Sequence, residues 1–299
     1  MTMRHFGISA PVIGIALAMA FGMVARADEG ARPLVPTEPL SIAPLAEQVF
    51  QAGLGESRAA AIGAESRLFA DRMAQVYLGG QEGESWRQEV ARIHDPARVS
   101  ALLLAAISVR LDPVRAADPR LLAALGATGV DAGPDGQGLI LAARIELAQR
   151  VELDLLVQRM RSDAAREAPV LAAIDHMIAM QDPVTPAMAR AMNRQMAFAG
   201  AFAEAGGFEF PTSPEDTAAD LSLQVPELQQ EAALRIRLNW YAAYAPLGAA
   251  AVNRAAAIRA SAEMQALHGL IERAEDDVLE KLAAETGRAA ARRMKGTPL

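Results

Sequence analysis

An imidazole and three carboxylates recur at helical spacing near the C-terminus, where they could do chemistry together. His268, Glu272, Glu275 and Asp276 stand at positions i, i+4, i+7 and i+8. Because these positions share one face of a helix, their side chains could hold a divalent cation. The same pattern is typical of a solvated charged face with Arg273 as counter-charge, and no second histidine stands at ligand spacing. The four residues are therefore candidate metal ligands, with a charged helix face as the alternative.

A run of methionines marks a second candidate region. Met188, Met192 and Met196 repeat every four residues, and His176 lies shortly before them. Thioethers with an imidazole can bind Cu(I), whereas methionine more often fills a core or forms an adaptable apolar contact surface. We treat these three methionines as a candidate contact surface, keep core packing and copper binding as alternatives, and predict no cofactor.

Sequence motifs that carry catalysis are missing from the chain. It has no G-x-S-x-G elbow, S-x-x-K motif, H-E-x-x-H helix or Walker loop. Residues 131–136 begin like a calcium loop, with Asp at positions one and five and Gly at six, but Ala142 stands where a bidentate glutamate is needed. This segment is therefore interpreted as a Gly-rich turn, and no catalytic residue is assigned.

The elements that must position these residues are predicted to be helices. Apolar residues recur at helical spacing, for instance Leu147, Val151 and Leu155, while long strand-like alternation is absent. An oxygen-bearing residue followed by proline is typical of a helix start. That pair occurs at Asp95-Pro96, Asp112-Pro113, Asp118-Pro119, Asp182-Pro183, Thr185-Pro186 and Ser213-Pro214.

These signals predict an all-α, multi-helix bundle. We expect helices over residues 45–53, 57–78, 84–94, 97–110, 114–125, 138–162, 168–180, 186–205, 214–222, 226–244, 247–259 and 262–294. Phe198, Phe202, Trp240, Tyr241 and Tyr244 lie on these helices at one-turn spacing and are expected in the core.

The N-terminal segment predicts export. Residues 1–27 combine Arg4, an apolar run over 6–24 and the small-x-small sequence of residues 25–27, which is the pattern of a secretory signal peptide. An uncleaved membrane anchor is the alternative, because the apolar run is almost long enough to span a bilayer. Four prolines within residues 28–44 predict an extended tether. The expected location is therefore the periplasm.

Composition excludes several functional classes. Of the 299 residues, 52% are hydrophobic, and the absence of cysteine excludes disulfides, thiolate metal sites and Cys nucleophiles. The net charge of -7 leaves no basic footprint for nucleic acid. Of the 29 cationic residues 27 are Arg, and because they are scattered we attribute them to genome composition rather than to recognition. The chain without residues 1–27 carries 27 cations against 36 anions and contains no stretch that predicts a stable membrane span.

A weak internal repeat predicts two related helical lobes. At an offset of 127 residues, Arg67 aligns with Arg194, and the pair Gly79-Gly80 aligns with Gly206-Gly207. The predicted lobes cover residues 45–162 and 163–299.

Four segments carry a resemblance to a known family. They are residues 191–200 leading to Gly206-Gly207, residues 224–228 continuing through Trp240 to Tyr244, residues 287–296, and residues 136–144. In these segments the chain resembles exported, uncharacterised bacterial proteins that carry the domain of unknown function numbered 2059. It departs from the family's Ser-Pro-x-Gly-Gln-like turn at residues 261–265, which read Ser-Ala-Glu-Met-Gln. The resemblance implies an all-helical exported protein and no particular activity.

Together these observations predict an exported helical protein of the cell envelope. We expect a non-catalytic protein that binds an envelope partner or an apolar ligand, with a purely structural component as a further alternative. An enzyme that uses a metal or carboxylates, centred on His268 and Glu272, is the alternative among catalytic proteins. Neither the identity of the partner nor the oligomeric state follows from the sequence.

Overall fold

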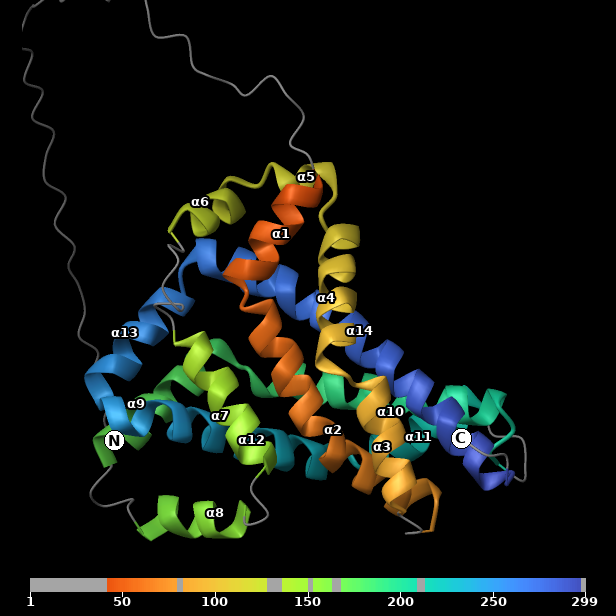
Figure 1. Cartoon of the computed structure of the whole chain (residues 1–299). Helices are drawn as coiled ribbons and strands as arrows, with labels where there is room; N and C mark the ends of the chain where they lie inside the picture. The colour runs from red at the N-terminus through yellow and green to blue at the C-terminus, as the bar shows by residue number, and fades with distance from the viewer. Residues whose placement is uncertain are drawn as a thin grey trace, which may run out of the picture. The chain divides into compact units, whose positions relative to one another are not determined.

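The fold is helical throughout the described part of the chain. The computed structural model describes residues 42–79, 83–127, 136–149, 153–162, 168–208 and 213–296, and every regular element in these ranges is a helix (Figure 1). The predicted all-α, multi-helix bundle is therefore confirmed. The predicted signal peptide and residues 28–41 of the predicted tether lie outside the described ranges, as does the calcium-loop-like segment up to residue 135.

The helices follow one another with short connections. They are α1 (Ile42–Ala52), α2 (Gly55–Tyr77), α3 (Glu84–Ile93), α4 (Pro96–Arg110), α5 (Pro113–Ala116), α6 (Pro119–Ala127), α7 (Gln137–Gln149), α8 (Leu153–Ser162), α9 (Ala168–Gln181), α10 (Val184–Glu204), α11 (Pro214–Leu223), α12 (Val225–Tyr244), the 3₁₀ turn η1 (Ala245–Leu247), α13 (Ala249–Arg259) and α14 (Ala262–Met294).

Side-chain caps before proline begin several of these helices, as predicted. The Asp95 carboxylate accepts a hydrogen bond from the Arg98 N–H at 3.0 Å, and Ser213 forms a reciprocal capping box with Asp216 at the start of α11. Such caps satisfy backbone N–H groups that have no partner within the helix. The pair Thr185-Pro186 differs, because α10 already begins at Val184.

The largest differences from the sequence-based expectation concern three of the expected helices. Helix α1 begins at Ile42, so the last residues of the predicted tether are helical, with Pro44 in the first turn where its missing N–H costs nothing. The helix expected over 114–125 is divided into α5 and α6 before Pro119, and the one expected over 138–162 corresponds to α7 and α8. Proline at a first helical position explains the first division.

The long helix α14 connects most of the fold. The long blue helix in Figure 1, α14, packs against α6, α4 and α3 in turn along its length and makes its most extensive contact with α10. Helix α2 contacts α4 and α7, while α12 contacts α7, α9 and α10. Residues far apart in sequence are thus brought together around α2, α10 and α14.

Two hydrophobic clusters form the core. The first joins apolar residues of α1–α6 to residues of α10 and α14, and the second joins residues of α7–α9 to residues of α12 and α13. The aromatic residues expected in the core are buried, with Phe198 and Phe202 in the first cluster and Trp240, Tyr241 and Tyr244 in the second. Each cluster draws on both sides of residue 162, so the core does not divide at the predicted lobe boundary, and the internal duplication stays a prediction.

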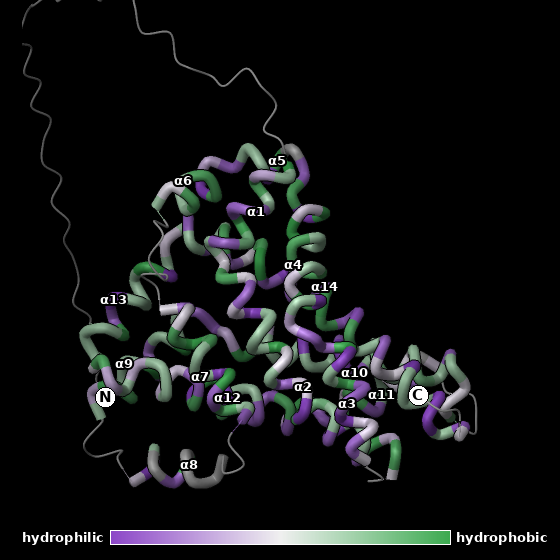
Figure 2. Tube along the Cα trace, viewed as in Figure 1, coloured by the Kyte–Doolittle hydropathy of each residue, from purple (hydrophilic) through white to green (hydrophobic). Residues whose placement is uncertain are grey.

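Hydrophobic and hydrophilic residues alternate along the helices, as expected for elements with one buried face (Figure 2). Of the helices in the described ranges, none combines the length and the apolar character needed to cross a membrane.

The contact between α10 and α14 depends on a glycine. A Cβ atom at Gly287 would overlap the carbonyl oxygen of Phe198 on α10, and it would lie 3.2 Å from the Phe202 nitrogen. Because these neighbours are backbone atoms, no side-chain rotation can relieve the overlap. Gly287 therefore permits the two backbones to approach closely.

We predict that Gly287→Ala lowers the free energy of unfolding by about 1–3 kcal/mol, because the helices must separate to admit the methyl group. Urea denaturation followed by circular dichroism measures the change. Gly200→Ala on exposed α10 surface is the matched control, since nothing lies within 4 Å of its added Cβ. This control should gain about 0.5–1 kcal/mol from helix propensity. Equal behaviour of the two variants would contradict the close approach.

Candidate functional site

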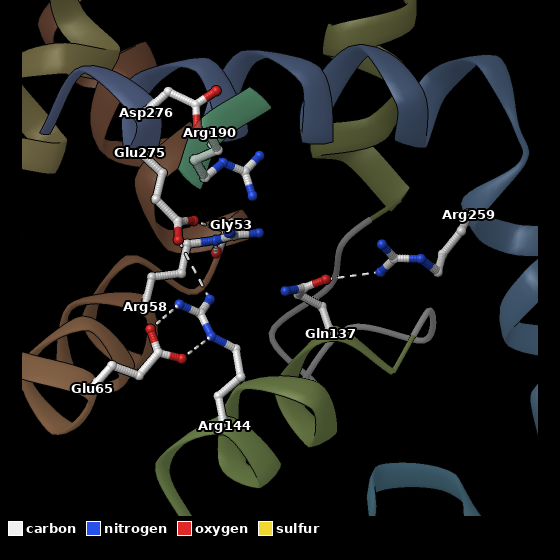
Figure 3. Close-up of polar contacts among 9 residues, drawn as sticks. All are labelled: Gly53, Arg58, Glu65, Gln137, Arg144, Arg190, Arg259, Glu275 and Asp276. Atoms are coloured by element: carbon white, nitrogen blue, oxygen red, sulfur yellow. Dashed lines mark hydrogen bonds and ion pairs between the residues drawn. The ribbon is translucent and has the colours of Figure 1, made fainter. Parts of the chain in front are cut away.

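Two of the three carboxylates predicted as metal ligands, Glu275 and Asp276, form ion pairs with arginines. Glu275 is 3% exposed, and its two oxygens lie 2.5 Å from Arg58 Nη1 and 3.4 Å from Arg144 Nη1. Asp276 forms an ion pair with Arg190 on α10. On the acidic face of α14, helices α2, α7 and α10 therefore place guanidinium groups against Glu275 and Asp276 (Figure 3).

His268 and Glu272 are half-buried on the same helix. Among the described residues, no group of three or more histidine, aspartate or glutamate side chains could hold a metal ion. The structure thus does not assemble His268, Glu272, Glu275 and Asp276 into a metal centre, since arginines have taken the charge of two of them.

The ion pairs extend from Glu275 into a network. Arg144 donates to the two Glu65 oxygens at 2.9 and 3.0 Å, in addition to Glu275. Arg58 also donates from Nε to the Gly53 carbonyl oxygen at 2.8 Å (Figure 3). Three helices, α2, α7 and α14, are joined by these charge-assisted bonds, which are stronger than bonds between neutral groups.

The network keeps its carboxylates ionised. Burial of the Glu275 carboxyl raises its pKa, but Arg144, Arg58 and Arg190 outweigh burial and lower the pKa to about 2. Glu65 is affected in the same way, because Arg144 overcomes the effect of burial and the pKa falls below its usual value. Neither group is therefore a proton donor near neutral pH.

A cavity of about 370 Å³ opens beside this network, where elements of the two core clusters meet. Its walls come from α2, α7, α10, α12 and α14 with the ends of α9 and α13. We call it the arginine cavity, because seven arginines line it: Arg58, Arg72, Arg144, Arg190, Arg194, Arg235 and Arg259. Only four acidic residues do so: Glu65, Glu231, Glu272 and Glu275. The cavity thus concentrates positive charge in a chain whose net charge is -7.

Two donors in the arginine cavity have no partner. The Nε atom of Arg194 and the Nε2 atom of Gln181 are buried and make no hydrogen bond. Arg194 makes no ion pair with any described residue, and its guanidinium lies 4.8 Å from the centre of the Phe69 ring. Burial together with Arg144 and Arg235 lowers the pKa of Arg194. Because buried donors are normally satisfied, an acceptor in the cavity would be stabilised at these two atoms.

Another arginine of the cavity lies between two amides. Arg259 donates from Nη1 to Gln137 Oε1 at 2.8 Å (Figure 3). It also donates from Nε to Gln181 Oε1 at 3.2 Å, and its guanidinium lies 5.9 Å from the centre of the Trp240 ring. Gln137 is the first residue of α7, and Pro183 precedes the first residue of α10. The positive ends of two helix dipoles therefore add to the charge of the arginines.

The residue types of the cavity suit recognition of an oxyanion. Its lining, drawn from the described residues, includes no serine, threonine, histidine, tyrosine, lysine or aspartate. Three of its four glutamates are paired with arginines, and Arg72 and Arg235 also lower the pKa of Glu231 against the effect of burial. Guanidinium groups with amides recognise carboxylate and phosphate oxygens. The arrangement therefore fits a bound oxyanion.

Sequence analysis missed this site. The arginines are separated by up to two hundred residues, and we attributed their abundance to genome composition. The structure corrects that interpretation for seven of them, which converge on one cavity. Spacing carries one signal that could have been used, because Arg58, Glu65 and Arg72 recur every seven residues along one face of α2.

The predicted methionine surface is only partly exposed. Met188, Met192 and Met196 are half-buried on α10. Of the neighbouring residues on α9, Met177 is buried in the second core cluster and His176 is exposed, so these two side chains lie on different sides of that helix. A contact surface at the three methionines stays a prediction.

Comparison with known proteins adds no relative, since no family model, no curated protein and no solved structure matches the chain. The resemblance to the family numbered 2059 therefore stays a prediction from its segments. Two of these segments, residues 191–200 and 287–296, belong to α10 and α14, which pack together.

Glu275→Gln should lower the free energy of unfolding by about 3–5 kcal/mol, because it leaves the buried Arg58 guanidinium without a counter-charge. Chemical denaturation monitored by circular dichroism measures the loss. Asp277→Asn is the matched control on the same helix, since the Arg110–Asp277 pair is partly exposed and should contribute less than about 1 kcal/mol. A loss at Glu275 no larger than the loss at Asp277 would contradict the role of the network.

A buried histidine lies behind the cavity wall. His94 is 2% exposed, its ring centre lies 5.7 Å from that of Phe69, and its Nδ1 lies 2.9 Å from the Val90 carbonyl oxygen. Burial, together with Arg194 and Arg98, lowers the pKa of His94 from 6.5 to about 4. The folded chain therefore holds this ring neutral in a range where the unfolded chain binds a proton.

This depressed pKa predicts a pH-dependent stability. The contribution of the neutral His94 ring to the free energy of unfolding should be complete above about pH 6.5. It should fall by about 3 kcal/mol as the pH decreases to 4, because only the unfolded state gains the proton. Urea denaturation of the wild-type chain and of His94→Gln across this range tests it. The difference between the two free energies should narrow towards pH 4, and a constant difference would contradict the prediction.

Proposed function

We propose that this chain is an exported, non-catalytic binding protein of the cell envelope, and that its arginine cavity takes a small ligand with an oxyanion group. The observation that carries the proposal is the pair of unpartnered donors, Arg194 Nε and Gln181 Nε2, in a cavity with seven arginines. Export rests on the signal-peptide pattern of residues 1–27 and on the family resemblance.

The charge of the cavity supports an anion rather than a purely apolar ligand. An uncompensated buried cation is costly, and an oxyanion at Arg194 would compensate it. Arg259 and Gln137, which also line the cavity, could orient a second oxygen, since Arg259 already meets amide oxygens there. This refines the sequence-based expectation of an apolar ligand.

The alternative of an enzyme centred on His268 and Glu272 gains no support from the geometry. Glu272 lines the arginine cavity, but His268 is not among its lining residues. The carboxylates next to Glu272 along α14 are held by arginines.

The variant Arg194→Met tests whether Arg194 binds a ligand or stabilises the fold. With the buried charge removed, the variant should unfold at the same temperature as the wild-type chain or a higher one, while it loses stabilisation by anions. Thermal denaturation in phosphate and in butyrate, each against sodium chloride of equal ionic strength, measures both properties.

Arg92→Met is the matched control, because Arg92 is exposed, is paired with Glu89 and does not line the cavity. It should keep the anion response of the wild-type chain. A wild-type chain that gains no stability from either anion, or an Arg194→Met variant that responds as strongly as the control, would contradict the proposed function.

A further inference from the structure

An apolar groove lies next to the arginine cavity. It has a volume of about 530 Å³ and is lined by residues of α2, α7 and α12. Its apolar lining consists of Ala64, Leu68, Leu147, Ala148, Leu234 and Leu238. Leu68 is 45% exposed and Leu234 is 41% exposed, so the groove presents uncovered hydrocarbon surface.

The groove and the cavity share a wall. Five residues line both spaces: Glu65, Arg144, Glu231, Arg235 and Asn239. Two ion pairs stand in this wall, Arg144 with Glu65 at 2.9 Å and Arg235 with Glu231 at 2.8 Å. A charged space and an apolar space therefore lie next to each other and share lining residues.

The same helices supply both spaces within one turn. On α7, Leu147 follows Arg144 by three residues, and on α12, Leu238 follows Arg235 by three residues; all four residues line the groove. One helical turn covers about 5.4 Å, so guanidinium and leucine surfaces lie within the length of one small molecule.

On this basis, and resting on the proposed function, we propose that the ligand is an anionic amphiphile. Its oxyanion head lies in the arginine cavity near Arg194, and its apolar chain lies in the groove against Leu68 and Leu234. Each space has the volume of a small-molecule site, which is typically about 300–1,000 Å³. The positive cavity selects the charge of the head, and the leucines select an unbranched apolar chain.

The proposal predicts that binding affinity increases with the length of the ligand's hydrocarbon chain. Each methylene buried in the groove should tighten binding by roughly threefold, following the free energy of burying one CH₂ group. Isothermal titration calorimetry with butyrate, hexanoate, octanoate and decanoate on the full chain measures this series. Octyl phosphate tests whether the head must be a carboxylate, and decanol tests whether it must be charged.

The expected result is a rise in affinity of about tenfold for every two methylenes, with decanol at least tenfold weaker than decanoate. Octyl phosphate that binds as tightly as octanoate identifies the head as a general oxyanion, and weaker binding identifies a carboxylate; both results support the amphiphile. Affinity that does not change from butyrate to decanoate would overturn the inference, as would decanol binding equal to decanoate.

Two variants distinguish the two spaces. Leu68→Gln combined with Leu234→Gln should flatten the dependence of affinity on chain length, whereas Arg194→Met should weaken the binding of every acid of the series. Leu223→Gln is the matched control, because Leu223 is 77% exposed and lines neither space.

The two proposals fail in different ways. If butyrate binds through Arg194 but longer chains add nothing, the groove is not a ligand site and the proposed function stands. If no acid of the series binds, both proposals are wrong. If the leucine double variant keeps the wild-type dependence on chain length, the apolar chain does not lie in this groove.

Discussion

The buried Glu275 carboxylate is the interaction on which this arrangement depends. It sits on α14, between Arg58 from α2 and Arg144 from α7, and Arg144 in turn holds Glu65. A carboxylate removed from water is costly unless it is paired and hydrogen-bonded. Glu275 therefore specifies where three helices from distant parts of the chain must meet, and the arginine cavity opens at that meeting point.

The cavity holds more positive charge than the carboxylates of the ion-pair network neutralise. The ion pairs are Glu275 with Arg58, Glu65 with Arg144, Glu231 with Arg72 and Arg235, and Asp276 with Arg190. Arg194 has no ion pair among the described residues. Replacing buried ion pairs by apolar residues often stabilises a protein. A cluster that retains surplus guanidinium groups beside an uncovered apolar groove is thus easier to understand as a binding site than as a source of stability. The tight packing of α10 on α14 at Gly287 offsets part of its cost.

Capping residues and the helical spacing of apolar residues predicted most of the helices. Asp95 and Ser213 cap α4 and α11 as their sequence pattern indicates, and the buried aromatic residues were identified from one-turn spacing. The errors also have local causes, since a proline at position 119 divides one expected helix. The candidate site was predicted poorly. The acidic face of α14 was recognised as a group, but its partners were not, because ion pairs across 217 or 131 residues leave no periodic signal.

Sequence alone determined the all-helical class, the absence of cysteine chemistry and the approximate positions of most helix starts, because each depends on residue types or on residues close together along the chain. The export signal is likewise a prediction from neighbouring residues. Tertiary structure decided what the charges do. Whether a glutamate at helical spacing is solvated, binds a metal or pairs with arginine depends on which helix packs against it. Only the packing of α7 on α2 and α12, of α10 on α12, and of α14 on α10 brought scattered arginines together at one cavity, and placed leucines one turn away as its apolar neighbour.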